Sequence, residues 1–164
     1  MSKVGNDSTV NLLYSILFPV AKLMSEIPDT PQLQEMIKMI SPLAQLATKL
    51  AELIFSVPNA GYCLSLLFHI FTPDSSNPKD EVIYKDCFNA LGDTINQIYQ
   101  NNVPYPEKIE NVIKMVEWVV NKNAGARAAM KKSSVFVKAI KNAADNCKDD
   151  LKIYYTKILD KLLA

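Results

Sequence analysis

Apolar residues recur three or four positions apart through most of this 164-residue chain, and this spacing limits its fold more than any other feature. Such spacing places side chains on one face of an α-helix, whereas a half-buried strand shows alternation at every second residue. No segment alternates convincingly, so the sequence predicts an all-α protein. The longest stripe comprises Phe136, Ile140, Ala143, Cys147, Leu151, Tyr154, Ile158 and Leu162. At ~1.5 Å per residue, one helix carrying this stripe would be about 40 Å long.

Prolines divide the pattern into separate helices, because a proline interrupts helical hydrogen bonding. Pro28, Pro58 and Pro73 each follow an apolar run, while Thr30-Pro31 and Ser41-Pro42 are typical of a cap followed by a helix start. Helices are expected over residues 8–26, 30–40, 42–57, 60–71, 80–100, 107–121 and 133–162, with a short helical turn at 126–132. The prediction is therefore a single helical bundle, residues 1–164, of about six to eight helices with a long C-terminal helix.

Residues 10–24 and 60–71 are apolar almost all the way round. Both runs are shorter than the ~20 residues that a bilayer-spanning helix needs, so we expect them to be buried bundle helices. Cys63, Cys87 and Cys147 are odd in number, widely spaced and set among apolar residues, which favours buried, reduced thiols. Without a recognisable secretory signal, we expect a cytoplasmic protein, with recruitment to a membrane as the alternative.

Charge is distributed unevenly along the chain. Residues 1–119 carry eight lysines against thirteen acidic residues, a net charge of −5, whereas residues 120–164 carry a net charge of +6. The basic end can meet an anionic lipid surface or an acidic partner, or the two ends can neutralise each other within one bundle. The candidate membrane or partner contacts are Trp118, Lys122, Arg127, Met130, Lys131, Lys132, Phe136, Lys138 and Lys141. Within this set, the basic and amphipathic stretch at 126–141 is the one best suited to an anionic membrane surface, although a solvated bundle face explains the same residues.

No pattern for catalysis or ligand binding is evident. The single histidine, His69, lies inside an apolar run, so we expect it in the core or at the core boundary. The residues around it do not form a set of metal ligands at the usual spacing. Phosphate-binding and dinucleotide-binding motifs are missing from the sequence. We therefore expect no enzyme activity, cofactor, metal or small-molecule substrate, although a site assembled from scattered residues stays an alternative. Nucleic acid is not expected as a partner, because the basic stretch holds one arginine and, apart from Phe136, no aromatic residue among its lysines.

The order of apolar helices, an amphipathic pair of helices, a basic link and a long closing helix resembles the N-terminal bundles of cell-death proteins. These are the HeLo-like domains and the bundle of mixed-lineage-kinase-domain-like pseudokinases. The resemblance rests on residues 88–99 and 135–163, in particular on Leu91, Ile95, Phe136, Lys138 and Leu151. It implies regulated oligomerisation and membrane attachment or permeabilisation.

The Bcl-2-like fold has a similar length and a buried central helix that opens on an Asn-Trp-Gly-Arg signature. Here residues 123–127 read Asn-Ala-Gly-Ala-Arg, which lacks the tryptophan, and they precede a basic helix, not an apolar one. The sequence therefore counts against that fold.

Two functions are predicted from these patterns. The first is a non-catalytic interaction or signalling module that contacts another protein, or a second copy of itself, through helix–helix packing. The alternative is a membrane-active cell-death or toxin-type bundle that uses its basic C-terminal part.

Overall fold

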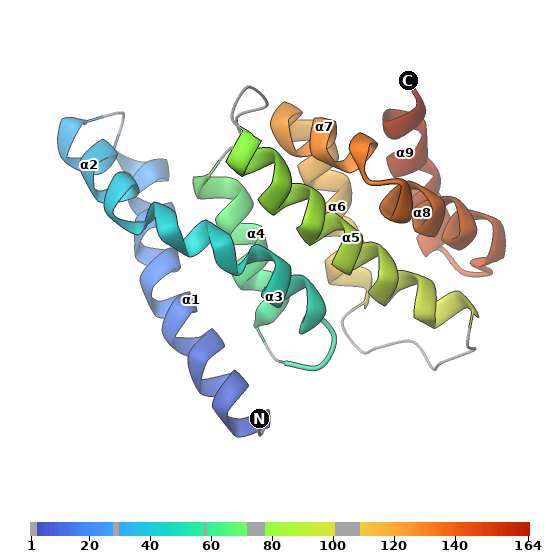
Figure 1. Cartoon of the computed structure of the whole chain (residues 1–164), viewed down its shortest axis with the longest axis horizontal. Helices are drawn as coiled ribbons and strands as arrows, with labels where there is room; N and C mark the ends of the chain where they lie inside the picture. Colours follow the sequence, from blue (N-terminus) through green and yellow to red (C-terminus); the bar gives the residue numbers. More distant parts are fainter. Residues whose placement is uncertain (1–2, 28–29, 58, 72–77, 101–108) are drawn as a thin grey trace.

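The computed structural model describes residues 3–27, 30–57, 59–71, 78–100 and 109–164. These residues form helices and no strand, which confirms the predicted all-α class for the part of the chain that is described (Figure 1). The elements are α1 (Lys3–Glu26), α2 (Pro31–Ile40), the 3-10 helix η1 (Ser41–Leu46), α3 (Ala47–Glu52), α4 (Ala60–Ile70), α5 (Pro78–Gln100), α6 (Ile109–Lys122), α7 (Ala124–Lys132), α8 (Ser134–Asn146) and α9 (Leu151–Leu163).

The helices form an elongated bundle with α5 near its middle (Figure 1). α5 packs against α3, α7 and α8, while α4 packs against α1, α3 and α6. α1 and α2 lie at one end of the molecule, and α8 and α9 pack together at the other. In this view α4 and α6 lie behind α3 and α5.

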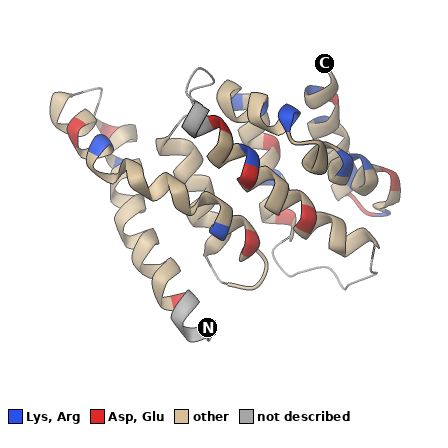
Figure 2. Ribbon diagram, viewed as in Figure 1, with Lys and Arg blue, Asp and Glu red and all other residues tan. Residues whose placement is uncertain are grey.

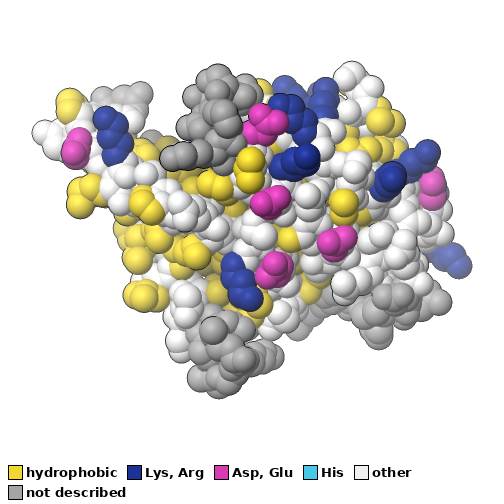
Figure 3. All heavy atoms as spheres, viewed as in Figure 1, with side chains coloured by type: hydrophobic (Ala, Val, Ile, Leu, Met, Phe, Trp, Pro, Cys, Tyr) yellow, Lys and Arg dark blue, Asp and Glu magenta, His cyan; other side chains and the backbone are white. Residues whose placement is uncertain are grey.

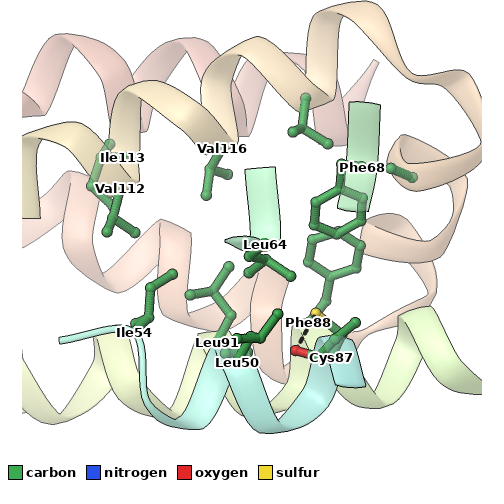
Figure 4. Close-up of a cluster of buried hydrophobic side chains, with 14 of the residues drawn as sticks. Leu50, Ile54, Leu64, Phe68, Cys87, Phe88, Leu91, Val112, Ile113 and Val116 are labelled. Carbon is green, nitrogen blue, oxygen red and sulfur yellow. Dashed lines mark hydrogen bonds between the residues drawn. The ribbon is translucent and has the colours of Figure 1, made fainter. Parts of the chain in front are cut away.

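Aromatic and aliphatic side chains from several helices meet in one continuous core (Figure 4). The Phe68 and Phe88 rings stack with centroids 5.4 Å apart, and the Phe88 and Phe136 centroids are 5.3 Å apart. These contacts connect α4 to α5 and α5 to α8. Because Phe88 and Phe136 are almost fully buried, each holds a large apolar area away from water.

The cap predicted at Thr30 forms at the start of α2, whereas the cap predicted at Ser41 does not form. The Thr30 side chain accepts a hydrogen bond from the Leu33 N–H at 3.2 Å, as the Thr-Pro pair predicts. The Ser41 hydroxyl instead donates to the Lys38 carbonyl at 2.9 Å. The predicted helix at 42–57 is accordingly divided into η1, α3 and a turn. The prolines expected to stop three of the helices, Pro28, Pro58 and Pro73, lie outside the described residues.

The expected long C-terminal helix does not form as one piece. α8 ends at Asn146, and Cys147 adopts an extended backbone with φ −70° and ψ 129°. The Asp149 carboxylate then accepts hydrogen bonds from the Leu151 N–H at 2.9 Å and from the Cys147 thiol at 3.1 Å. This local pairing competes with helix continuation, as short polar side chains commonly do.

The break lets α9 pack against α8, and the predicted stripe is shared by two helices. Its members are nevertheless buried, with one exchange. Tyr155 is fully buried, whereas Tyr154, the residue that the stripe predicted, is only partly buried. Leu151, Ile158 and Leu162 keep their predicted inward positions, and Tyr155 completes the row at spacings of four, three and four.

No helix in the described ranges combines the length and the apolar character that crossing a bilayer requires.

Candidate functional site

The basic stretch predicted as a contact surface consists of two helices. α7 ends at Lys132, and the Ser133 side chain accepts a hydrogen bond from the Phe136 N–H at 3.1 Å, which starts α8. Residues 126–141 are therefore not one amphipathic helix lying on the surface.

The apolar side of this stretch belongs to the core. Met130 and Phe136, expected as membrane or partner contacts, are both 0% exposed. α8 packs on α5 so closely that a Cβ added at Gly92 would lie 2.8 Å from the Phe136 Cα. In this conformation neither residue is available to a membrane or a partner, because neighbouring helices already bury both.

The charged side of the stretch stays at the surface, with some of its cations engaged by the bundle itself (Figure 2). Lys132 pairs with Glu81 at 2.9 Å, and Lys131 donates to the Ala164 carbonyl at 3.1 Å. The Arg127 guanidinium donates to the Val120 carbonyl at 3.1 Å, near the C-terminal end of α6. Favourable cation contacts at helix ends are common. Lys138 and Lys141 are exposed.

A second candidate surface lies where α4 and α6 run side by side in the same direction. Near their starts, a Cβ added at Gly61 would lie 3.6 Å from the Val112 side chain, and further along the His69 and Trp118 ring centroids are 6.3 Å apart. We call this the α4–α6 surface. It consists of Tyr62, Ser65 and His69 on α4 with Asn111, Met115, Trp118 and Lys122 on α6.

A small apolar pocket opens at the N-terminal end of the α4–α6 surface. Its volume is about 110 Å³. Its lining residues are Ile54, Val57, Asn59, Gly61, Tyr62, Ser65, Asn111, Val112 and Met115. Figure 4 shows Ile54 and Val112 pointing toward each other from the two sides of this region. Its wall is mainly apolar, with amide and hydroxyl groups among the lining residues.

The pocket size matches one apolar side chain. An apolar cavity of ~150 Å³ holds a benzene molecule, whereas pockets for metabolites and drugs commonly measure ~300–1,000 Å³. At about 110 Å³ the pocket is therefore suited to a group the size of a leucine or smaller side chain. This size favours an anchoring contact with another chain over the enclosure of a substrate.

The segment before α4 is tied to α1. Asn59 has a left-handed backbone with φ 69°, and its side-chain amide donates to the Asn11 side-chain oxygen at 3.2 Å. Asparagine tolerates this conformation better than most residues do. The link holds the mouth of the pocket against α1.

The acidic residues of α6 sit away from the pocket. Glu110 pairs with Lys114 at 2.7 Å, and the Lys114 ammonium lies 5.7 Å from the centre of the Tyr154 ring on α9. The hydrogen bond and the negative charge of Glu110 raise the pKa of Lys114. Lys122 is exposed at the opposite end of α6.

Trp118 is the predicted contact residue that the structure places most clearly on a candidate surface. Trp118 is 40% exposed, and its ring lies beside that of His69. His69 is also exposed and does not lie in the core. The sequence identified Trp118 because it lies off the apolar stripe of its helix. Tyr62 and the pocket were missed, since nothing local indicates that α4 and α6 meet.

Two of the cysteine thiols are poorly suited to nucleophilic chemistry. Burial raises the pKa of Cys63 to about 11 and also raises the pKa of Cys87. The Cys87 thiol donates to the Ala47 carbonyl at 3.5 Å (Figure 4). Since the thiolate is the reactive form, both remain protonated near neutral pH. Within the described ranges no group of three or more His, Cys, Asp or Glu side chains is arranged to hold a metal ion.

Comparison with family models, curated proteins and solved structures finds no match to this chain.

Proposed function

We propose that this protein is a non-catalytic interaction module that binds an α-helix of a partner protein on the α4–α6 surface. The observation that carries the proposal is the side-chain-sized pocket between two parallel helices, with the exposed Trp118 further along the same surface. Tryptophan is enriched among the residues that contribute most to binding energy at protein interfaces.

The spacing of the surface residues supports a helical ligand. Asn111, Met115, Trp118 and Lys122 follow one another at intervals of four, three and four residues along α6. A helix bound in a groove presents its own anchors at the same intervals, so it can contact this row turn by turn. One anchor fills the pocket near Met115, and the next contacts Trp118.

The test selects helical peptides from a display library on the wild-type protein and measures their affinity for variants. Gly61→Leu puts a large side chain at the pocket, and Trp118→Ala removes the exposed ring. We expect each change to weaken binding at least about tenfold, that is by ~1.4 kcal/mol or more. Val82→Ala is the matched control, because Val82 is exposed on α5 away from this surface. Circular dichroism establishes that each variant is folded.

Peptides that bind all the variants equally well would contradict the proposal. So would a selection that enriches no peptide with apolar residues at helical spacing.

The alternative, a membrane-active bundle, requires Met130 and Phe136 to leave the core, because neighbouring helices bury both. In the described conformation this part of the protein presents lysines but not its apolar side. Co-sedimentation with anionic and with neutral vesicles distinguishes the two functions. Binding to anionic vesicles alone, weakened by salt and by neutralising Lys131, Lys132 and Lys138, would favour the membrane alternative.

A further inference from the structure

Exposed apolar side chains gather at the end of the molecule opposite α8 and α9. Among the described residues twelve large apolar side chains are exposed, and seven of them lie between residues 12 and 46. Figure 3 shows hydrophobic side chains concentrated over α1, α2 and η1. Single exposed apolar residues are ordinary on a protein surface, but a contiguous group of them commonly marks an interaction site.

Helical spacing places most of these residues on one side of α1 or on one side of α2. On α1 and just beyond it, Leu12, Ile16, Leu23 and Ile27 are four, seven and four residues apart, so they share one side of that helix. Met36 and Met39 share one side of α2, which packs beside α1. We call this the N-terminal apolar face. It consists of Leu12, Ile16, Ile27, Met36, Met39 and Leu46.

The bundle itself leaves this face largely uncovered. Leu33 is the buried residue of α2, whereas Met39 is 76% exposed and Leu12 is 63% exposed. The exposed fractions of the six residues amount to roughly three fully exposed large side chains.

The charges that border the face identify its occupant. α1 carries no charged residue between Ser8 and Ala21 and then carries Lys22 and Glu26, while α2 carries Glu35 and Lys38. All four of these charged side chains are exposed. Each helix thus contributes one positive and one negative charge to a border that is neutral overall.

We propose that the N-terminal apolar face binds the same face of a second copy of this chain. Two copies related by a two-fold axis bring identical patches together. Each contact then occurs twice, because residue i of the first copy meets residue j of the second, and residue j of the first meets residue i of the second. A border with both signs lets lysines of one copy lie near carboxylates of the other. A border without net charge offers an anionic lipid surface or a nucleic acid no net attraction.

The test measures molar mass in solution by light scattering and sedimentation over a range of concentrations. The wild-type protein is expected to form a dimer, and the double variant Leu12→Lys/Met39→Lys is expected to be monomeric at the same concentrations. The control is Val82→Lys/Ile153→Lys, which places two lysines at positions 58% and 57% exposed on α5 and α9. This control is expected to remain dimeric.

A wild-type protein that is monomeric at ~100 µM would overturn the proposal, and so would two double variants that behave alike. Vesicle binding by a monomeric wild-type protein, if the Leu12→Lys/Met39→Lys variant loses it, would assign the face to lipid and overturn the proposal too. Trp118→Ala is expected to remain dimeric, so the outcome is independent of the α4–α6 surface. Circular dichroism of each variant separates loss of the dimer from loss of the fold.

Discussion

Two helical glycines, Gly92 and Gly61, differ in how much space surrounds them. A Cβ added at Gly92 would lie 2.8 Å from the Phe136 Cα and 3.0 Å from its backbone nitrogen. Backbone atoms cannot move aside as a flexible side chain can, so α5 and α8 approach this closely only because residue 92 is glycine. At Gly61 the nearest atoms would lie at 3.6 and 3.7 Å, which is ordinary contact with the side chains of Val112 and Ile54.

The first prediction compares alanine at these two positions. Alanine is favoured over glycine inside a helix by ~0.5–1 kcal/mol, so Gly61→Ala should raise the free energy of unfolding by about that amount. Gly92→Ala should lower it by ~1–3 kcal/mol, because α8 must shift away from α5. Urea denaturation of both variants measures the difference. Equal effects of the two substitutions would show that the close approach at Gly92 is not a constraint.

At the scale of elements, two buried polar residues join the helices of the C-terminal half. Asn123 accepts from the Ala126 N–H at 2.9 Å at the start of α7, and its amide donates to the Phe68 carbonyl near the end of α4 at 3.2 Å. Ser133 caps α8 through the Phe136 N–H, and its hydroxyl donates to the Asn89 side chain on α5. Each residue therefore caps the start of one helix and also forms a hydrogen bond to another helix.

The second prediction uses neighbouring serines. Ser133→Ala removes the cap of α8 and leaves the Asn89 side chain without its Ser133 donor, so we expect a loss of ~1–3 kcal/mol in unfolding free energy. Ser134→Ala changes an exposed serine one residue away and should alter stability by less than ~0.5 kcal/mol. Thermal unfolding of the two variants tests this. A similar loss at both positions would mean that the cap is not specific to Ser133.

At the scale of the whole molecule, the core does not include every helix equally. Its cluster of buried side chains takes members from α1 and from α3 through α9 but none from α2. Only partly buried side chains of α2, Ile37 and Ile40, pack against this cluster. Local stability commonly follows the number of buried apolar contacts, so α2 should be the helix that opens most easily.

The third prediction concerns hydrogen exchange in the native state. Amides of α2 should exchange fastest among the helices, and those of α5 and α8 around Leu91 and Ile140 should exchange slowest. Mass spectrometry after timed deuterium labelling measures this order. If the N-terminal apolar face pairs as proposed, protection of α2 should also rise with protein concentration. Protection of α2 equal to that of α5 at low concentration would contradict the prediction.

The sequence by itself determined the helical class and the inward side of most helices. Periodicity of three or four and caps such as Thr30 act within one or two turns, so they can be recognised without knowledge of the fold. The stripe of the last segment was identified correctly for Phe136, Ile140 and Leu151, all of which are buried. Trp118 was likewise recognised as a residue outside the apolar stripe of its helix.

Only the tertiary structure decided what covers each apolar side. An amphipathic pattern shows that a side chain is better removed from water, but a membrane, a partner and a neighbouring helix all achieve this. Neighbouring helices bury Met130 and Phe136, which the sequence had placed at a contact surface, while Leu12 and Met39 remain exposed. The break at Cys147 and the pocket between α4 and α6 likewise depend on contacts between distant segments, which local spacing does not encode.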